Sequence, residues 1–190
     1  MQDKIEVRWH GRGGQGAKTA AQFLAEAALE TGKFIQAFPE YGPERAGAPI
    51  RAYTRISTSP ITIHSGVTNP DAVVVIDPTL LSSVNATEGL SESGILLVNT
   101  QEDPKTIRKK LNFNKGKVAT VNATKISFDT LGIFMPNTPM LGALVKIKPI
   151  VSLDVLIENV KKKFLKKIGE EKTNANIAGI KRAYMETIVG

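Results

Sequence analysis

A glycine-rich segment near the N-terminus holds the residues whose types and spacing best suit ligand binding. It consists of Gly11, Arg12, Gly13, Gly14, Gln15 and Gly16, and it fits the pattern G-x-G-x-x-G between a predicted strand and a predicted helix. In that context, backbone amides and the helix N-terminus can hold phosphate oxygens. Arg12 and Lys18 add positive charge. The same glycines also suit a structural tight turn, so the pattern leaves both interpretations open.

Polar side chains also gather between residues 39 and 55. The segment from Pro39 to Pro49 is predicted to be a stiff loop that interrupts regular structure. A stiff loop loses little conformational entropy on binding, which suits recognition, although taken alone it is more simply a rigid surface crossover. The candidate partner-binding residues are Glu40, Tyr41, Glu44, Arg45, Arg51 and Arg55.

Some of these residues have a second interpretation. Glu40 stands about where a dinucleotide site places the acid that binds ribose, but it lies among prolines and glycines rather than at a strand tip. Arg51, Tyr53 and Arg55 alternate along a predicted strand and share one face. That face predicts either a ridge for an anionic ligand or acidic partner, or an ordinary solvent-facing surface.

The composition excludes several kinds of catalytic and metal site. The sequence contains no cysteine, which excludes a disulfide scaffold, a thiolate nucleophile and a cysteine-ligated zinc or iron–sulfur centre. Its two histidines are His10 and His64, and we expect His10 to be packed or hydrogen-bonded rather than catalytic. No Ser–His–Asp set and no metal-spaced carboxylates can be assembled. We therefore expect the chain to hold no cofactor and no metal, and to catalyse no reaction alone.

Charge and hydropathy narrow the range of partners. The net charge is +7, of which residues 161–190 carry +5 and residues 1–160 only +2. A solvated helix face is a better interpretation of the lysine clusters than a single-strand nucleic-acid groove, which would need a series of interleaved aromatic residues. The apolar run Ala72–Ile76 is too short to cross a membrane. The first residues contain no signal-peptide core, so we expect a cytoplasmic protein.

Strand and helix patterns alternate along the chain. Hydrophobic alternation or continuous β-branched runs predict strands at Lys4–Trp9, Lys33–Phe38, Ile50–Ile56, Ile61–His64, Ala72–Ile76, Ile95–Val98 and Val118–Val121. Helical spacing and capping residues predict helices at 15–30, 78–84, 104–111, 138–147, 152–168 and 174–188. The Ile61–His64 strand is expected to form an antiparallel hairpin with Ile50–Ile56. Thr138 and Ser152 are expected to cap their helices.

These elements predict an α/β fold. We expect three α/β/α layers with a mixed, mainly parallel sheet and a helical C-terminal extension. The predicted domain organisation is an α/β domain over residues 1–168 and a basic helical tail over residues 169–190.

Three segments resemble the gamma subunit of 2-oxoacid:ferredoxin oxidoreductases. They are Arg8–Ala20, Gln36–Pro49 and Pro136–Leu144, and the last looks like that of the pyruvate enzyme. The resemblance implies a subunit of an enzyme that decarboxylates a 2-oxoacid with thiamine diphosphate, reduces ferredoxin and releases acyl-CoA. It further implies alpha and beta partner subunits that hold thiamine diphosphate and Mg, a delta subunit with iron–sulfur clusters, and a gamma subunit that helps to cover the approach of coenzyme A.

The residues leave other functions open. A free-standing Rossmann-type protein could bind NAD or FAD through Gly11, Gly13 and Gly16. A non-enzymatic binder of nucleic acid or acidic protein could act through the lysine tail. We favour the gamma subunit, with the glycine turn as a phosphate or coenzyme A contact. The sequence does not say which 2-oxoacid the enzyme uses.

Overall fold

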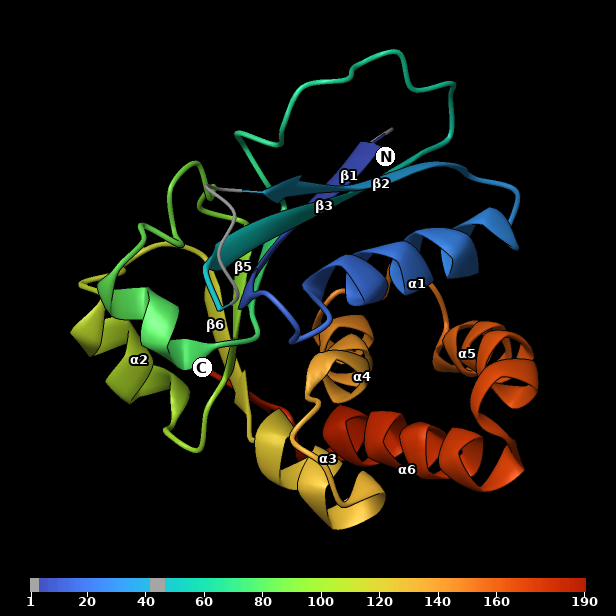
Figure 1. Ribbon diagram of the computed structural model, residues 1–190. Coiled ribbons are helices and arrows are strands. Elements are labelled where there is room, and N and C mark those ends of the chain that lie inside the picture. The colour runs from blue at the N-terminus through green and yellow to red at the C-terminus, as the bar shows by residue number, and fades with distance from the viewer. Residues whose placement is uncertain (1–3, 42–46) are drawn as a thin grey trace.

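A seven-stranded mixed sheet organises the protein (Figure 1). The computed structural model describes residues 4–41 and 47–190, with only the backbone of residue 41. The strands are β1 (Lys4–Arg12), β2 (Phe34–Tyr41), β3 (Pro49–Ser57), β4 (Ala72–Val75), β5 (Ile95–Asn99), β6 (Lys117–Val121) and β7 (Ile188–Val189). Their order across the sheet is β2-β3-β1-β4-β5-β6-β7.

The pairing of the strands confirms the predicted mixed sheet. β1, β4, β5 and β6 are neighbours in parallel. β3 is antiparallel to both β1 and β2, and β7 is antiparallel to β6. Five of these strands therefore run in one direction, and only β3 and β7 run in the other.

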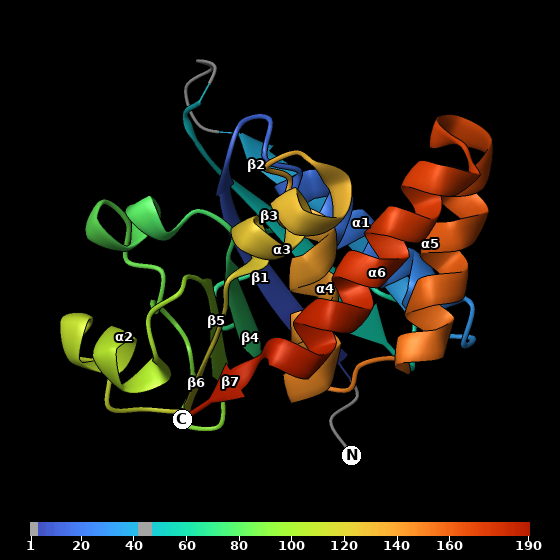
Figure 2. The same ribbon diagram turned by 90° about the horizontal axis from the view of Figure 1, so that it is seen from below.

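Helices cover one face of the sheet almost completely, as Figure 2 shows. They are α1 (Ala17–Leu29), α3 (Ala123–Leu131), α4 (Asn137–Ile147), α5 (Leu153–Ile168) and α6 (Glu170–Glu186). The main apolar core lies between them and the sheet and includes Trp9, Leu24 and Leu97, each with no exposed surface. At Gly142, an added Cβ would lie 2.1 Å from the Ile180 carbonyl oxygen, so only glycine lets α4 and α6 approach this closely.

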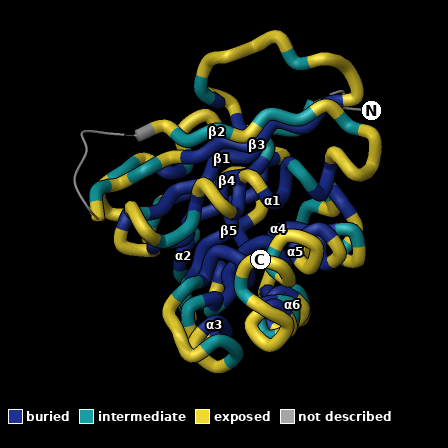
Figure 3. The backbone as a smooth tube through the Cα atoms, turned by 45° about the vertical axis from the view of Figure 1, so that its right-hand side comes forward, coloured by how far each residue is buried: buried dark blue, intermediate teal, exposed yellow. Residues whose placement is uncertain are grey.

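The opposite face is covered in two different ways. Over β4, β5 and β6, the short helices η1 (Pro78–Ser82) and α2 (Pro104–Lys110) enclose a smaller apolar core. Over β1 and β3, the irregular segment 58–71 lies on the sheet and supplies backbone carbonyls to buried arginines. Figure 3 shows the buried strands enclosed by exposed loops and outer helix surfaces.

Three polar side chains cap helices, and one of them, Ser152, was predicted to do so. Asp77, Asp103 and Ser152 each accept a hydrogen bond from a first-turn amide, in η1, α2 and α5 respectively. Gly169 ends α5 with a φ of 81°. These signals are local, because a cap and its amide lie two or three residues apart in the sequence.

Other local predictions were wrong. Residues 61–64 form no strand, because the carbonyls of Ile63 and Ser65 accept hydrogen bonds from the buried Arg55 instead of pairing in a ladder. Thr138 does not cap α4, which begins one residue earlier, and its hydroxyl donates to Asn176 Oδ1 at 2.9 Å. The sequence prediction also lacked α3 and β7, although Asn122 caps α3 through Lys125 N.

The C-terminal segment 169–190 shares the core of the rest of the chain. α6 packs against α3, α4 and α5, and its Ile180 and Ala183 have no exposed surface. β7 extends the sheet beside β6. The division into 1–168 and 169–190 stays a prediction. Among the described residues, no helix is both long and apolar enough to span a membrane.

Candidate functional site

The glycine turn connects β1 to α1 at the edge of the sheet where the parallel strands end. Gly13 N donates to Ala48 O at 3.1 Å, and Gln15 N donates to Arg12 O at 3.1 Å. Gly16 precedes α1 with a φ of 80°, a conformation that suits glycine. An added Cβ there would also lie 2.5 Å from Asn137 Nδ2. The turn therefore needs glycine for its own geometry.

Side chains fill part of the turn. Gln15 Oε1 accepts a hydrogen bond from Arg12 N at 2.7 Å, and Gln15 Nε2 donates to Asp77 Oδ2 at 2.7 Å. Burial raises the pKa of the Asp77 carboxyl, but hydrogen bonds from Thr79 and Gln15 outweigh it and leave the pKa below its usual value. The Asp77 carboxylate therefore lies against one side of the glycine turn and places a negative charge there.

Arg12 is committed to this network. Its guanidinium donates to Asp77 Oδ2 at 3.1 Å, to Gly47 O at 3.1 Å and to Thr79 Oγ1 at 3.0 Å. The sequence predicted Arg12 as a positive charge beside the turn, and the structure shows that this charge is paired with Asp77. Arg12 positions the turn, and Lys18, exposed in the first turn of α1, is the cation better placed to meet a ligand.

A pocket of about 480 Å³ opens beside the turn, between α1, the α3–α4 connection, α5 and α6. Its walls combine glycines, apolar side chains and two lysines, and its lining residues are Gly14, Gly16, Thr19, Leu131, Ile133, Met135, Asn137, Thr138, Phe164, Lys167, Ile168, Lys172 and Asn176. Asn137 is buried against Gly16, and its Oδ1 accepts no hydrogen bond from the described part of the chain. No side chain caps α1 at Gly16, so the positive end of that helix faces this region.

Glu40 does not lie beside the glycine turn. It belongs to β2, where it pairs with Arg51 of β3, and its carboxylate accepts a short hydrogen bond from the Tyr53 hydroxyl. β3 separates β2 from β1, whereas a dinucleotide site places its acid on the strand next to the turn. This arrangement argues against the NAD- or FAD-binding alternative.

The predicted ridge on β3 is mostly buried, which corrects its interpretation as an exposed binding surface. Arg51 is exposed, but Tyr53 is 2% exposed and Arg55 is 1% exposed. Arg55 Nε donates to Glu6 Oε1 at 2.6 Å, and Arg55 Nη2 donates to Ser65 O at 2.6 Å. Burial, followed by the bond to Glu40, raises the pKa of Tyr53. Arg55 is therefore a structural residue rather than a partner contact.

A second buried arginine, Arg8 of β1, lies on the same face of the sheet as Arg55. Arg8 Nη2 donates to the carbonyls of Ala86 and Glu88, and Arg8 Nε donates to His10 Nε2 at 3.1 Å. Burial and the neighbouring Arg8 and Arg51 charges lower the pKa of His10 to about 3. His10 is therefore a neutral hydrogen-bond acceptor, as expected for a packed histidine.

Some predicted site residues cannot be placed. Glu44 and Arg45 lie outside the described residues, and Tyr41 is described only as the last backbone position of β2. Asp77, Asn137, Lys167 and Lys172 were missed in the sequence. Asp77 offered one signal, because it directly follows a buried strand whose end meets the end of β1.

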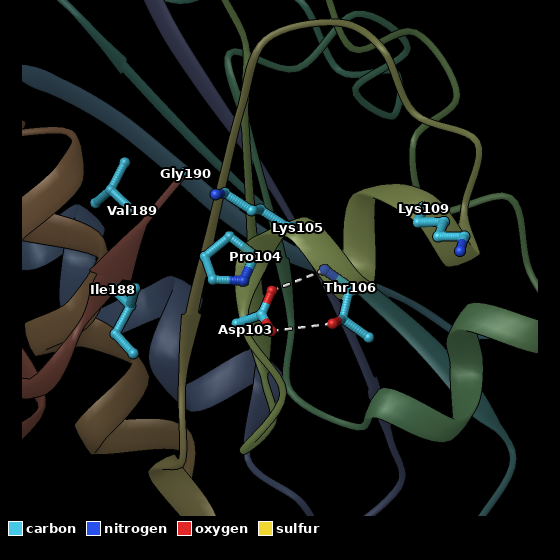
Figure 4. A pocket seen from close by; sticks show the side chains of 8 residues that line it. All are labelled: Asp103, Pro104, Lys105, Thr106, Lys109, Ile188, Val189 and Gly190. Atoms are coloured by element: carbon cyan, nitrogen blue, oxygen red, sulfur yellow. Dashed lines mark hydrogen bonds between the residues drawn. The ribbon is translucent and has the colours of Figure 1, made fainter.

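A second hollow of about 520 Å³ lies between α2 and the C-terminal strand (Figure 4). Its carboxylate, Asp103, is used as a helix cap and accepts from Thr106 N and Thr106 Oγ1. These two hydrogen bonds lower the pKa of Asp103. Among residues 4–40 and 47–190, no group of three or more His, Cys, Asp or Glu side chains could hold a metal ion.

Comparison with known proteins places this arrangement in one family. The family model of pyruvate ferredoxin/flavodoxin oxidoreductase matches residues 6–186. The pyruvate synthase subunit PorC of Thermotoga maritima is 55% identical over 96% of this chain and 94% of its own length. The common gamma subunit of the pyruvate/ketoisovalerate oxidoreductases of Thermococcus kodakarensis is 45% identical over 97% of this chain and 98% of its own length.

The fold agrees with a solved structure as well. The crystal structure of a Thermotoga maritima pyruvate oxidoreductase subunit matches with a TM-score of 0.89 and 50% identity, covering 100% of this chain and 99% of the other. The sequence segments that resemble the gamma subunit lie in the glycine turn, in β2–β3 and in α4 of this shared fold. The chain therefore belongs to the pyruvate ferredoxin/flavodoxin oxidoreductase family, as a subunit of the gamma type.

Proposed function

We propose that the chain works as the non-catalytic gamma subunit of a cytoplasmic pyruvate:ferredoxin oxidoreductase that forms acetyl-CoA, CO₂ and reduced ferredoxin. One observation carries this proposal: the chain corresponds over nearly its whole length to relatives that are separate subunits of such enzymes. Alpha and beta subunits would hold thiamine diphosphate and Mg, and a delta subunit would hold the iron–sulfur clusters. This chain would contribute surfaces and no cofactor.

Pyruvate is the substrate we favour, because the relative with 55% identity is named as a pyruvate synthase subunit. The Thermococcus kodakarensis relative is named as common to pyruvate and ketoisovalerate enzymes. A subunit shared in that way does not select the 2-oxoacid. We therefore expect the partner subunits of this chain to determine which 2-oxoacid is used.

The assembly proposal is tested with the chain alone and in its complex. The isolated chain should fold and show no 2-oxoacid-dependent reduction of viologen. Co-expression with the larger subunits should give a complex that contains this chain and reduces viologen with pyruvate and coenzyme A. Turnover by the isolated chain, or failure of the chain to enter the complex, would refute the proposal.

The glycine turn, Gly11–Gly16, is proposed to contact a phosphate of coenzyme A. The uncapped N-terminus of α1 and the exposed Lys18 in its first turn support this role. Arg12 is unsuitable as a probe, because it holds Gly47 and Asp77 in place. Lys18→Ala should instead raise the apparent KM for coenzyme A about tenfold, the effect of losing one charge-assisted contact. Lys161→Ala, on the exposed surface of α5, is the matched control.

The loop between β2 and β3 is proposed as a docking element for the catalytic subunits, through Glu40, Tyr41, Glu44, Arg45 and Arg51. Glu40 and Arg51 are exposed neighbours on paired strands, which supports a polar contact there. The double substitution Tyr41→Ala and Arg45→Ala should weaken assembly while leaving the Tm of the isolated chain nearly unchanged. Undiminished affinity of this variant for the other subunits would exclude the loop as a main docking element.

A further inference from the structure

Exposed aromatic and aliphatic side chains cluster where α3 leads into α4. Phe128 is 49% exposed, Ile133 is 52% exposed and Phe134 is 68% exposed. The rings of Phe128 and Phe134 stack with their centroids 4.9 Å apart and an interplanar angle of 13°. Single exposed apolar residues are ordinary, but a cluster of large ones on a soluble chain commonly marks an interaction site.

This cluster adjoins the 480 Å³ pocket, because Ile133 belongs to both. The pocket continues into a smaller groove of about 280 Å³ between α1 and α5, and the two share Thr19, Phe164 and Lys167. Apolar side chains therefore lead from the exposed ring pair through Ile133 into the pocket and on to Phe164. The smaller groove adds Phe23 to Phe164, and its other lining residues are the polar Thr19, Gln22, Lys163 and Lys167. A pocket that continues into a groove along α1 and α5 suits an extended segment of another protein.

The charges around the groove indicate the chemistry of that segment. Near the middle of α5, Lys162 and Lys163 pair with Glu30 and Glu26 of α1. Towards the pocket, Lys167 and Lys172 are exposed and form no ion pair with any described residue. The basic face is thus neutralised within the chain at one end of the groove and left positive at the other. An acidic segment would be attracted to the positive end.

We infer that this surface docks a segment of the larger catalytic subunit that carries apolar anchors flanked by carboxylates. The inference rests on the proposed function, since it assumes that the chain enters a complex. The anchors would cover Phe128, Ile133 and Phe134, and the carboxylates would meet Lys167 and Lys172. This surface is distinct from the β2–β3 loop. Its proposed anchor and charge contacts, Phe128, Ile133, Phe134, Lys167 and Lys172, lie outside the motifs that resemble the family, although glycines of the turn line the same pocket.

The apolar part is tested with the double substitution Phe128→Ala and Phe134→Ala. The chain is labelled with a fluorophore, assembled into the complex and chased with excess unlabelled chain. We expect the variant to dissociate about 30-fold faster than the wild type, because aromatic anchors dominate interface energetics. Leu29→Ala is the matched control, since Leu29 is 55% exposed at the far end of α1.

The charged part is tested with Lys167→Glu and Lys172→Glu together. This variant should dissociate faster than the wild type at low salt, and the difference should narrow as salt rises. Lys161→Glu reverses one charge elsewhere on α5, half the change of the test variant, and should leave the dissociation rate unchanged.

Each outcome decides between the explanations. Faster dissociation of both variants, with the Tm of each isolated variant preserved, supports the docking surface, and so does complete failure of such folded variants to assemble. Unchanged dissociation of both variants from an intact complex overturns the surface and leaves the proposed function standing. Failure of the wild-type chain to assemble refutes the proposed function instead. Direct binding of coenzyme A to the isolated wild-type chain, abolished by the lysine substitutions, would overturn the docking role in favour of a ligand pocket.

Discussion

The two faces of the sheet at β1 and β3 are buried by different means. On the helix face, Trp9 and Ala52 pack beneath α1 in a core of apolar side chains. On the other face, Arg8 and Arg55 are 3% and 1% exposed, although irregular segments rather than helices lie over them. Their guanidinium groups are satisfied by carbonyls of residues 63–67 and 86–88 and by the carboxylate of Glu6.

The comparison shows that alternation along a strand separates two faces without saying which one meets solvent. Apolar side chains gain stability on burial through removal from water. A buried arginine must instead be paired and hydrogen-bonded, because burying an unpaired charge is costly. An irregular segment can supply many carbonyls, since its backbone is not used in a ladder. The polar face therefore depends on the segment 58–71, and the apolar face depends on α1.

Among the substitutions that test this difference between the two faces, Arg55→Ala is expected to reduce stability most. Arg55→Ala should lower the free energy of unfolding by about 3–5 kcal/mol, because it removes the buried guanidinium that pairs with Glu6 and donates to the carbonyls of Ser65 and Gly66. Denaturant-induced unfolding measures the change. Arg51→Ala, four residues away on the same strand but exposed, should change the stability by less than about 0.5 kcal/mol. Equal effects of the two substitutions would mean that Arg55 is not buried as described.

A pH-dependent effect is expected at His10. The folded protein keeps the pKa of His10 at about 3, below its ordinary value of 6.5, so only the unfolded chain takes up the proton between these values. Stability from this group is therefore present above about pH 6.5 and is lost as the pH falls towards 3. His10→Gln keeps an acceptor for Arg8 and removes the titration.

The measurement is the difference in unfolding free energy between the wild type and this variant. Between pH 7 and pH 5, that difference should shift by about 2 kcal/mol in favour of the variant. A difference that stays constant over this range would show that His10 titrates normally in the folded protein.

The smallest effect is expected on the helix face, at a buried hydroxyl that bridges β1, β3 and α1. Thr54 Oγ1 accepts from Trp9 Nε1 at 3.0 Å and donates to Ala21 O at 2.9 Å. Thr54→Val removes both bonds at nearly constant volume and should cost about 1–2 kcal/mol. Thermal unfolding followed by Trp9 fluorescence reports the change. A loss as large as that of Arg55→Ala would indicate that the two faces do not differ as argued.

The candidate site was only partly predictable from the sequence, because a local pattern does not show which distant residues will meet. The glycine turn was recognised because its residues are consecutive, and a strand before it and a helix after it were confirmed. The hydrogen-bond partners of Arg12 were not predicted, because Gly47, Asp77 and Thr79 lie 35 to 67 residues away in the sequence. The pocket beside the turn was missed, since it forms only where α1, α4, α5 and α6 meet.

The sequence by itself determined the local features of this protein: the alternation of β1 and β3, the caps at Asp103 and Ser152, and the end of α5 at Gly169. Each depends on contacts between residues close in the chain. Only the tertiary structure decided that β3 lies between β1 and β2, that Arg55 is buried, and that Lys167 and Lys172 face a pocket beside the glycine turn. Those facts depend on which distant segments meet, and that is set by the packing of the whole core rather than by any local pattern.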